Sequence, residues 1–185
     1  HTSFLVQMTR LDLAFSFAEL PKFASCPGQK HLDQAERMLR YLAGTVDHGI
    51  TYSDPGAKRR NVLMGWVDSD FAADPDTRRS VTGYVISLNN GPVSWKAKRQ
   101  GCVTLSSAEA EFVAASQCGQ EVLYLRQLLE QLGYAQTEPT RVYEDNKACI
   151  KMSENPTNPG ASRHIDTRIY FIRQLVRDQV LRLHK

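Results

Sequence analysis

The chain has 185 residues, with 23 Lys and Arg against 20 Asp and Glu, and a formal net charge of +3. This length suits one domain with an appendage or two small domains, and so slight a charge does not by itself indicate a polyanionic partner. No apolar stretch approaches the roughly eighteen residues of a membrane span, and the amino terminus lacks the features of a signal peptide, so we expect a cytoplasmic protein without membrane association.

Residues 1–53 have the pattern of a helical segment. Apolar residues recur at helical spacing between Gln29 and Ala43, and Gly44 is expected to end that helix. Residues 54–61 combine Pro, Gly and like charges, which is typical of a linker. Since the chain begins with His1 rather than Met, we expect a fragment of a longer protein, with a second domain over residues 62–185.

Three strands in succession are predicted after the linker. Residues 62–67 form a near-continuous apolar run, typical of a strand covered on both faces, which ends at Asp68. Residues 80–88 make a second strand, and Asn89-Asn90-Gly91 indicates a hairpin into a third strand over residues 92–98. Trp66 and Trp95 lie in these strands and are interpreted as core residues.

Helices dominate the remainder. A long helix is predicted from Ser106 or Ser107 to Gly133, followed by a short strand over 141–144 and a helix over 147–154 that Asn146 can cap. Residues 155–160 read as a loop, 165–177 as a helix and 179–185 as a strand. The cysteines are far apart without a CxxC pair and are predicted to be buried, reduced thiols; they are Cys26, Cys102, Cys118 and Cys149.

Four aspartates crowd the loop that begins at Asp68. A calcium-binding EF-hand is excluded, because Ala73 and Arg79 occupy the positions that require Gly and Glu. We interpret three of the four, Asp70, Asp74 and Asp76, as a solvated acidic turn. Asp68 differs because it directly follows a buried strand, where a rigid backbone can aim a ligand.

Two glutamates at the start of the long helix need separate interpretations. Ser106 and Glu109 have the spacing of a capping box, which gives Glu109 a structural role. Glu111 lies about 200° around the helix from Glu109, on the apolar face, where an unpaired carboxylate is unfavourable. Either a cation or a lysine must compensate it.

Asp145 ends a strand and precedes a helix, the position at which open sheets present ligand groups. Taken alone it could be a simple cap. The joint pattern is more specific: an acid after the first antiparallel strand, one in the first turns of the next helix and one after the following strand. Gathered carboxylates repel one another, so this pattern favours a divalent-cation site.

The sequence resembles the ribonuclease H domain of copia-type long-terminal-repeat retrotransposons. The matching segments are VDSDFAADPDTRRSVTGYV, VSWKAKRQGCVTLSSAEAEFVAAS, VYEDNKACI and SRHIDTRIYFIR, and residues 9–53 are similar to the segment that joins reverse transcriptase to ribonuclease H. The resemblance implies an α/β fold with a mixed five-stranded sheet, three antiparallel strands then parallel ones, flanked by helices. It also implies Asp68, Glu111 and Asp145 as catalytic residues that hold two Mg²⁺ or Mn²⁺ ions.

The resemblance further implies cleavage of the RNA strand of an RNA/DNA hybrid, beside the reverse transcriptase of the same polyprotein, in the cytoplasm, in virus-like particles or in the nucleus. The family's fourth carboxylate normally follows the last strand, in a segment that the sequence ending at Lys185 does not reach, so the domain is expected to be truncated before its last helix. Asp166 could substitute for that carboxylate, although HIDTR reads as a motif of the preceding helix.

Candidate nucleic-acid-binding residues flank the second and third strands and follow the short strand; they are Arg78, Arg79, Lys96, Lys98, Arg99 and Asn146. A plain solvated surface is the alternative for the basic side chains. Two other functions stay open: a catalytically weak or inactive module of the same fold that binds nucleic acid or a protein, and an integrase or resolvase relative that prefers DNA.

Overall fold

The computed structural model describes residues 2–54, 56, 61–154 and 163–185, with side chains in the last range described from residue 167 onward. Its N-terminal part is helical: α1 (Thr2–Met8), η1 (Leu11–Leu13), α2 (Ala14–Glu19), η2 (Leu20–Phe23) and α3 (Gln29–Gly44). Residues 48–54 form no helix, so the predicted helical segment ends earlier than residue 53. None of the helices in the described ranges is both long and apolar enough to cross a membrane.

The second part contains a five-stranded sheet with three helices. Its elements are β1 (Leu63–Asp70), β2 (Val81–Leu88), β3 (Gly91–Arg99), α4 (Ser107–Gln131), β4 (Thr140–Tyr143), α5 (Lys147–Glu154), α6 (Arg163–Arg177) and β5 (Leu181–His184). The strand order is β3-β2-β1-β4-β5, in which β1 to β3 are antiparallel and β4 and β5 run parallel to β1. The predicted fold class is confirmed.

Local sequence explains the antiparallel strands. Asn89 and Asn90 both have positive φ, 52° and 62°, which is the backbone of the two-residue hairpin turn that connects β2 to β3. Asp68 does not end β1, contrary to the prediction. The ladder to β2 continues through Asp68↔Gly83 as far as Asp70↔Val81, because β2 is long enough to pair with these residues.

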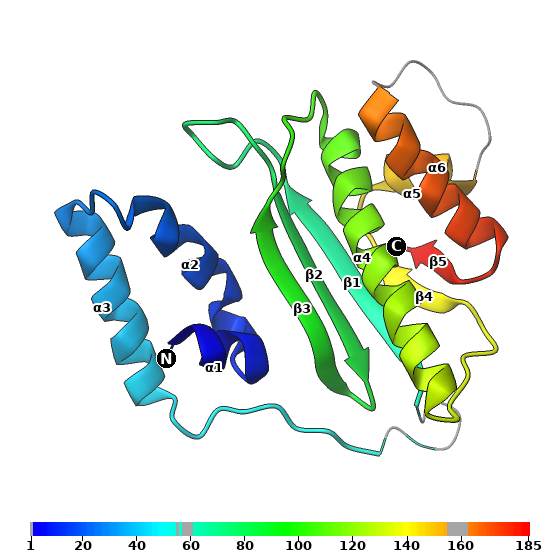
Figure 1. Cartoon of the computed structure of the whole chain (residues 1–185), viewed down its shortest axis with the longest axis horizontal. Coiled ribbons are helices and arrows are strands. Elements are labelled where there is room, and N and C mark those ends of the chain that lie inside the picture. The colour runs from blue at the N-terminus through cyan, green and yellow to red at the C-terminus, as the bar shows by residue number, and fades with distance from the viewer. Residues whose placement is uncertain (1, 55, 57–60, 155–162) are drawn as a thin grey trace.

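The hydrophobic core lies between the sheet and the helices α4, α5 and α6 (Figure 1). Gly119 of α4 allows α6 to approach closely, since a Cβ added there would meet Leu175 Cδ1 at 2.9 Å. Only one face of β1 is covered in this way: Val67 is buried, whereas Trp66 is 42% exposed. The interpretation of Trp66 as a core residue is therefore wrong, because the predicted cover over its face is absent from the described part of the chain.

The N-terminal helices lie beside β3, which is the edge strand of the sheet farthest from β5 (Figure 1). Val6 and Leu13 of this segment are buried, and the indole Nε1 of Trp95 on β3 donates a hydrogen bond of 2.9 Å to the Val6 carbonyl. The side chain of Trp95 thus lies at the contact with the N-terminal segment. The division at residues 54–61 remains a prediction about domains.

Candidate active site

Three acidic side chains from separate elements converge at one end of the sheet. Each of Asp68, Glu111 and Asp145 offers a carboxylate oxygen, and these oxygens lie within 4.8 Å of one another. The parallel register of β1 and β4 explains two of them: Trp66 pairs with Tyr143, so Asp68 and Asp145 each lie two residues beyond the same rung. The convergence that the sequence pattern predicted is present.

The start of α4 places the third carboxylate. Ser106 Oγ accepts a hydrogen bond of 3.2 Å from the Glu109 amide, and Glu109 Oε2 accepts one of 2.7 Å from the Leu105 amide. The capping role predicted for Glu109 is confirmed. Because Glu109 is held back at the helix start, Glu111 is the acid of this turn that the helix presents to Asp68 and Asp145.

Glu111 has the electrostatics of a group that needs a cation. It is 5% exposed, and its Oε2 has no hydrogen-bond partner among the described residues. Burial, followed by the charge of Glu144, raises the pKa of Glu111 to about 8. Oxygen-only carboxylate donors are the ligands that Mg²⁺ and similar hard cations prefer, so these residues fit a divalent ion.

Glu144 is a further acid, which the sequence reasoning missed. It is 2% exposed; its Oε1 accepts a hydrogen bond of 3.0 Å from the Asn146 amide, and its Oε2 is unpartnered within the described structure. Burial raises its pKa to about 7. The period-two alternation of β4 could have indicated it, because Glu144 follows Val142 on the buried face.

Asn146 holds the turn that carries Asp145. Its Oδ1 accepts hydrogen bonds from the amides of Ala148 at 2.9 Å and Cys149 at 3.1 Å, which confirms that it caps α5. A contact of Asn146 with nucleic acid remains a prediction.

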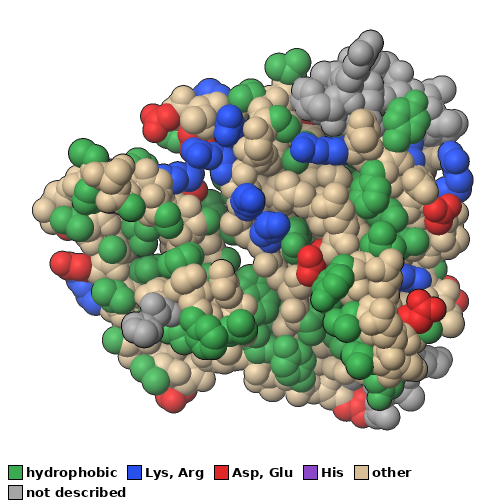
Figure 2. Space-filling view, viewed as in Figure 1, with side chains coloured by type: hydrophobic (Ala, Val, Ile, Leu, Met, Phe, Trp, Pro, Cys, Tyr) green, Lys and Arg blue, Asp and Glu red, His purple; other side chains and the backbone are tan. Residues whose placement is uncertain are grey.

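The predicted basic residues differ in how freely they face solvent. Lys96, Lys98 and Arg78 are exposed, and Arg79 is half-buried. Arg99 instead directs Nη1 to Asp74 Oδ2 at 2.9 Å. Figure 2 shows Lys and Arg side chains gathered where the N-terminal helices face β3 and the β1–β2 loop.

Two other predictions need correction. The prediction of a solvated turn is wrong for Asp74, which does cap Thr77 but is 5% exposed because Lys22 and Arg99 cover it. The four cysteines are free thiols, but the prediction that all are buried is wrong: Cys26 is exposed and Cys102 half-buried, since each lies in a segment that connects two elements. The side chain of Asp166 lies outside the described residues, so its predicted role as a substitute ligand stays a prediction.

The strand order, the strand directions and the three carboxylates define a ribonuclease H-like domain. No protein-family model matches the chain. The retrovirus-related Pol polyprotein from transposon TNT 1-94 of Nicotiana tabacum is 37% identical over 179 residues, which are 96% of this chain and 13% of the polyprotein. That from transposon RE1 of Arabidopsis thaliana is 35% identical over 177 residues, 95% of this chain and 12% of the polyprotein.

The chain therefore belongs to the family of retrovirus-related Pol polyproteins of copia-type transposons, which confirms the resemblance seen in the sequence. It spans 13% and 12% of the length of these two relatives. Among solved structures it is similar to LC11-RNase H1, isolated from compost, with a TM-score of 0.49 and 14% identity over 67% of this chain and 83% of that one.

Proposed function

We propose that this chain is an endonuclease that hydrolyses the RNA strand of RNA/DNA hybrids during retrotransposon reverse transcription. The single observation that carries the proposal is the convergence of Asp68, Glu111 and Asp145, with Glu111 buried and one of its oxygens unpartnered in the described structure. Membership of the retrovirus-related Pol polyproteins supports a site that acts on nucleic acid beside a reverse transcriptase.

The three carboxylates would hold two divalent ions, Mg²⁺ or Mn²⁺. Ions bound there supply an activated water and stabilise the charge on the leaving oxygen. Asp68 is held by the β1–β2 ladder and Asp145 by the turn that Glu144 and Asn146 close, so both reach the site from rigid backbone. Glu111 comes from a capped helix start, where burial excludes water from one side of its carboxylate.

The exposed basic side chains of β3 would contact the backbone of the hybrid. Lys96 and Lys98 are both exposed on this strand, and contacts to phosphates do not depend on base sequence. Recognition of the hybrid would then come from its shape and its 2′-hydroxyl groups.

Cleavage of an end-labelled RNA strand in a hybrid, with Mg²⁺ or Mn²⁺, tests the proposal. We expect Asp68→Asn to lower the cleavage rate more than about 100-fold, since even outer-shell changes at metal sites cause losses of about 10- to 100-fold. Asp70→Asn is the matched control, because Asp70 is exposed on the same strand and outside the carboxylate cluster. The cleavage rate of Asp70→Asn should match that of the wild type.

Three results would contradict the proposal in different ways. Cleavage that Asp68→Asn retains would refute the site. Binding of the hybrid without cleavage would favour a catalytically inactive module of the same fold. A preference for double-stranded DNA over the hybrid would favour an integrase or resolvase relative.

A further inference from the structure

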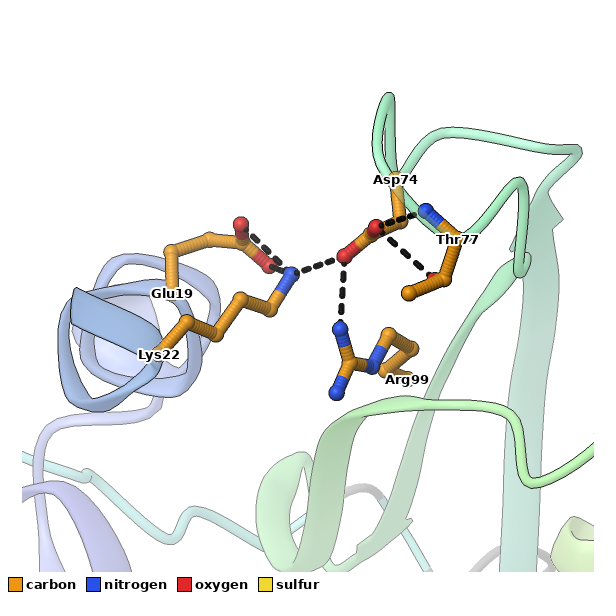
Figure 3. Close-up of polar contacts among 5 residues, drawn as sticks. All are labelled: Glu19, Lys22, Asp74, Thr77 and Arg99. Carbon is orange, nitrogen blue, oxygen red and sulfur yellow. Dashed lines mark hydrogen bonds and ion pairs between the residues drawn. The ribbon is translucent and has the colours of Figure 1, made fainter.

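The N-terminal segment is tied to the sheet by an ion network around one buried carboxylate, that of Asp74. Asp74 Oδ2 accepts Lys22 Nζ from η2 at 3.0 Å and Arg99 Nη1 from β3 at 2.9 Å (Figure 3). Asp74 Oδ1 accepts the Thr77 amide at 2.9 Å and the Thr77 hydroxyl at 2.8 Å. The carboxylate therefore joins η2 and β3 to the β1–β2 loop, in which Asp74 and Thr77 both lie.

The ion network buries the Asp74 carboxylate and stabilises its charged form. The side chain of Asp74 is 5% exposed and that of Lys22 17%, and Glu19 fixes Lys22 from the other side with Oε1 at 2.6 Å. The Thr77 amide, followed by Arg99, holds the pKa of Asp74 well below its ordinary range. Removing Lys22 would leave Glu19 without its ion-pair partner and Asp74 with Arg99 alone, so the tie from η2 to the β1–β2 loop would be lost.

The segment that Lys22 holds forms one side of a cleft that reaches Asp68 and Asp145. A cavity of about 680 Å³ lies between the N-terminal helices and the uncovered face of the sheet. Its lining includes Leu11 and Phe15 on one side, Trp66 and Lys96 on the other, and Asp68 and Asp145 at the site. The position of the segment therefore sets the width of this cleft.

The lining suits a nucleic-acid strand. Trp66 is 42% exposed and stacks on Tyr143 with ring centroids 5.8 Å apart, and both line the cavity. Two lysines, Lys96 and Lys185, are also in the lining, and Asp12 on the facing side is paired with Arg10. Aromatic faces combined with basic side chains bind unpaired nucleotides, because bases stack on the rings while the cations meet the phosphates.

We propose that the Lys22–Asp74 ion pair is a latch that keeps the N-terminal segment in place as one wall of this cleft, and that the occupant is a nucleic-acid strand on its way to the three carboxylates. Asp74 and Lys22 are positioning residues, since neither belongs to the carboxylate cluster. The identity of the occupant rests on the proposed function, whereas the latch does not.

The test compares Lys22→Met with Lys30→Met, which removes the same charge from an exposed position in α3. Three quantities are measured: amide hydrogen exchange of residues 2–24, the Kd of a short RNA/DNA hybrid with an unpaired overhang in Ca²⁺, and the Kd of Mn²⁺. Lys22→Met should speed exchange in residues 2–24 and weaken hybrid binding about tenfold, because only the latched population presents the complete cleft. Its Mn²⁺ affinity should not change.

The control variants separate the latch from simple charge loss. Lys30→Met should leave exchange unchanged and weaken hybrid binding less than about twofold. Lys22→Arg keeps the charge and should restore both readouts, which a general folding defect would not do. Equal losses in Lys22→Met and Lys30→Met would overturn the latch.

Two further outcomes bear on the occupant. If Lys22→Met frees the segment but hybrid binding stays at the wild-type value, nucleic acid does not occupy the cleft and that part is overturned. If the wild type binds no hybrid while Lys22→Met still frees the segment, the proposed function and the occupant both fail and the latch stands.

Discussion

Replacing Glu111 with Gln should remove the proposed activity and yet stabilise the metal-free protein. Glu111 is 5% exposed, and its Oε2 has no hydrogen-bond partner in the described part of the chain. Its carboxylate is close to Asp68 and Asp145. Burial, followed by the charge of Glu144 and less so by those of Asp68 and Asp145, raises its pKa from 4.5 to about 8. Gln has the same shape without the charge.

Proton linkage determines how the free energy of unfolding changes with pH. A carboxyl whose pKa is higher in the folded than in the unfolded state binds more protons when folded, so the free energy of unfolding is greatest below pH 4.5 and falls as the pH rises to about 8. A pKa difference of one between the two states corresponds to about 1.4 kcal/mol, which sets an upper limit of about 5 kcal/mol at pH 8. Solvent beside the exposed Asp68 and Asp145 screens the repulsion, so we expect Glu111→Gln to gain about 1–3 kcal/mol at pH 8 and almost nothing at pH 5.

Urea unfolding at pH 5 and pH 8, in EDTA and in Mn²⁺, measures both effects. The wild type should gain about 2.7 kcal/mol at a Mn²⁺ concentration of 100 Kd, and the variant less than about 1 kcal/mol. Glu109→Gln is the matched control two residues earlier, where lost charge at the helix start should destabilise the protein by about 0.3–1 kcal/mol. A Glu111→Gln variant less stable than the wild type in EDTA at pH 8 would refute the reasoning, as would a wild type that Mn²⁺ does not stabilise.

Two further predictions concern the surroundings of the site. Replacing both Lys96 and Lys98 with Met should weaken hybrid binding and make the fall of log K with log salt concentration less steep by about 1–2. Fluorescence anisotropy between about 50 and 200 mM salt measures this slope. The control is Lys151→Met, which changes an exposed lysine on α5. An unchanged slope would exclude β3 from the binding surface. Glu144→Gln keeps an acceptor for the Asn146 amide but removes a nearby charge, so the Mn²⁺ affinity should fall about three- to tenfold by calorimetry, less than in Asp145→Asn. Equal losses in the two variants would make Glu144 a direct ligand.

Local patterns predicted the three antiparallel strands and the joint pattern of acids, whereas the complete mixed five-stranded sheet was implied by the family resemblance. The Asn89-Asn90 turn fixes the hairpin through its backbone angles, and the spacing of Ser106 and Glu109 identifies which acid caps α4. These are interactions between residues only a few positions apart, and their geometry follows from residue type. Glu111 lies near a helix start and Asp145 just after a strand, as their positions in the sequence indicate, whereas Asp68 lies within β1 rather than at its end.

Contacts between distant residues could not be predicted in this way. The Trp95–Val6 hydrogen bond joins residues 89 positions apart, and Lys22 and Asp74 are 52 positions apart. Nothing in the β1–β2 loop itself indicates which side chain will cover Asp74. Its interpretation as a turn residue was correct for the Thr77 cap and wrong for its burial, because the N-terminal segment supplies that burial.

The unfavourable interactions of the site belong to two buried side chains, Glu111 and Glu144. The backbone that carries the site residues is held by regular hydrogen bonds. Asp68 lies in the β1–β2 ladder, Asp145 lies in a turn closed by a hydrogen bond from the Asn146 amide to Glu144, and α4 begins with a cap. The scaffold should therefore stay folded without ions, while Glu111 and Glu144 are unfavourably buried as charged groups, which the proposed cation would compensate. A site of this kind would bind cations through carboxylates already in place, and a stabilised but inactive Glu111→Gln variant would be the most direct evidence for it.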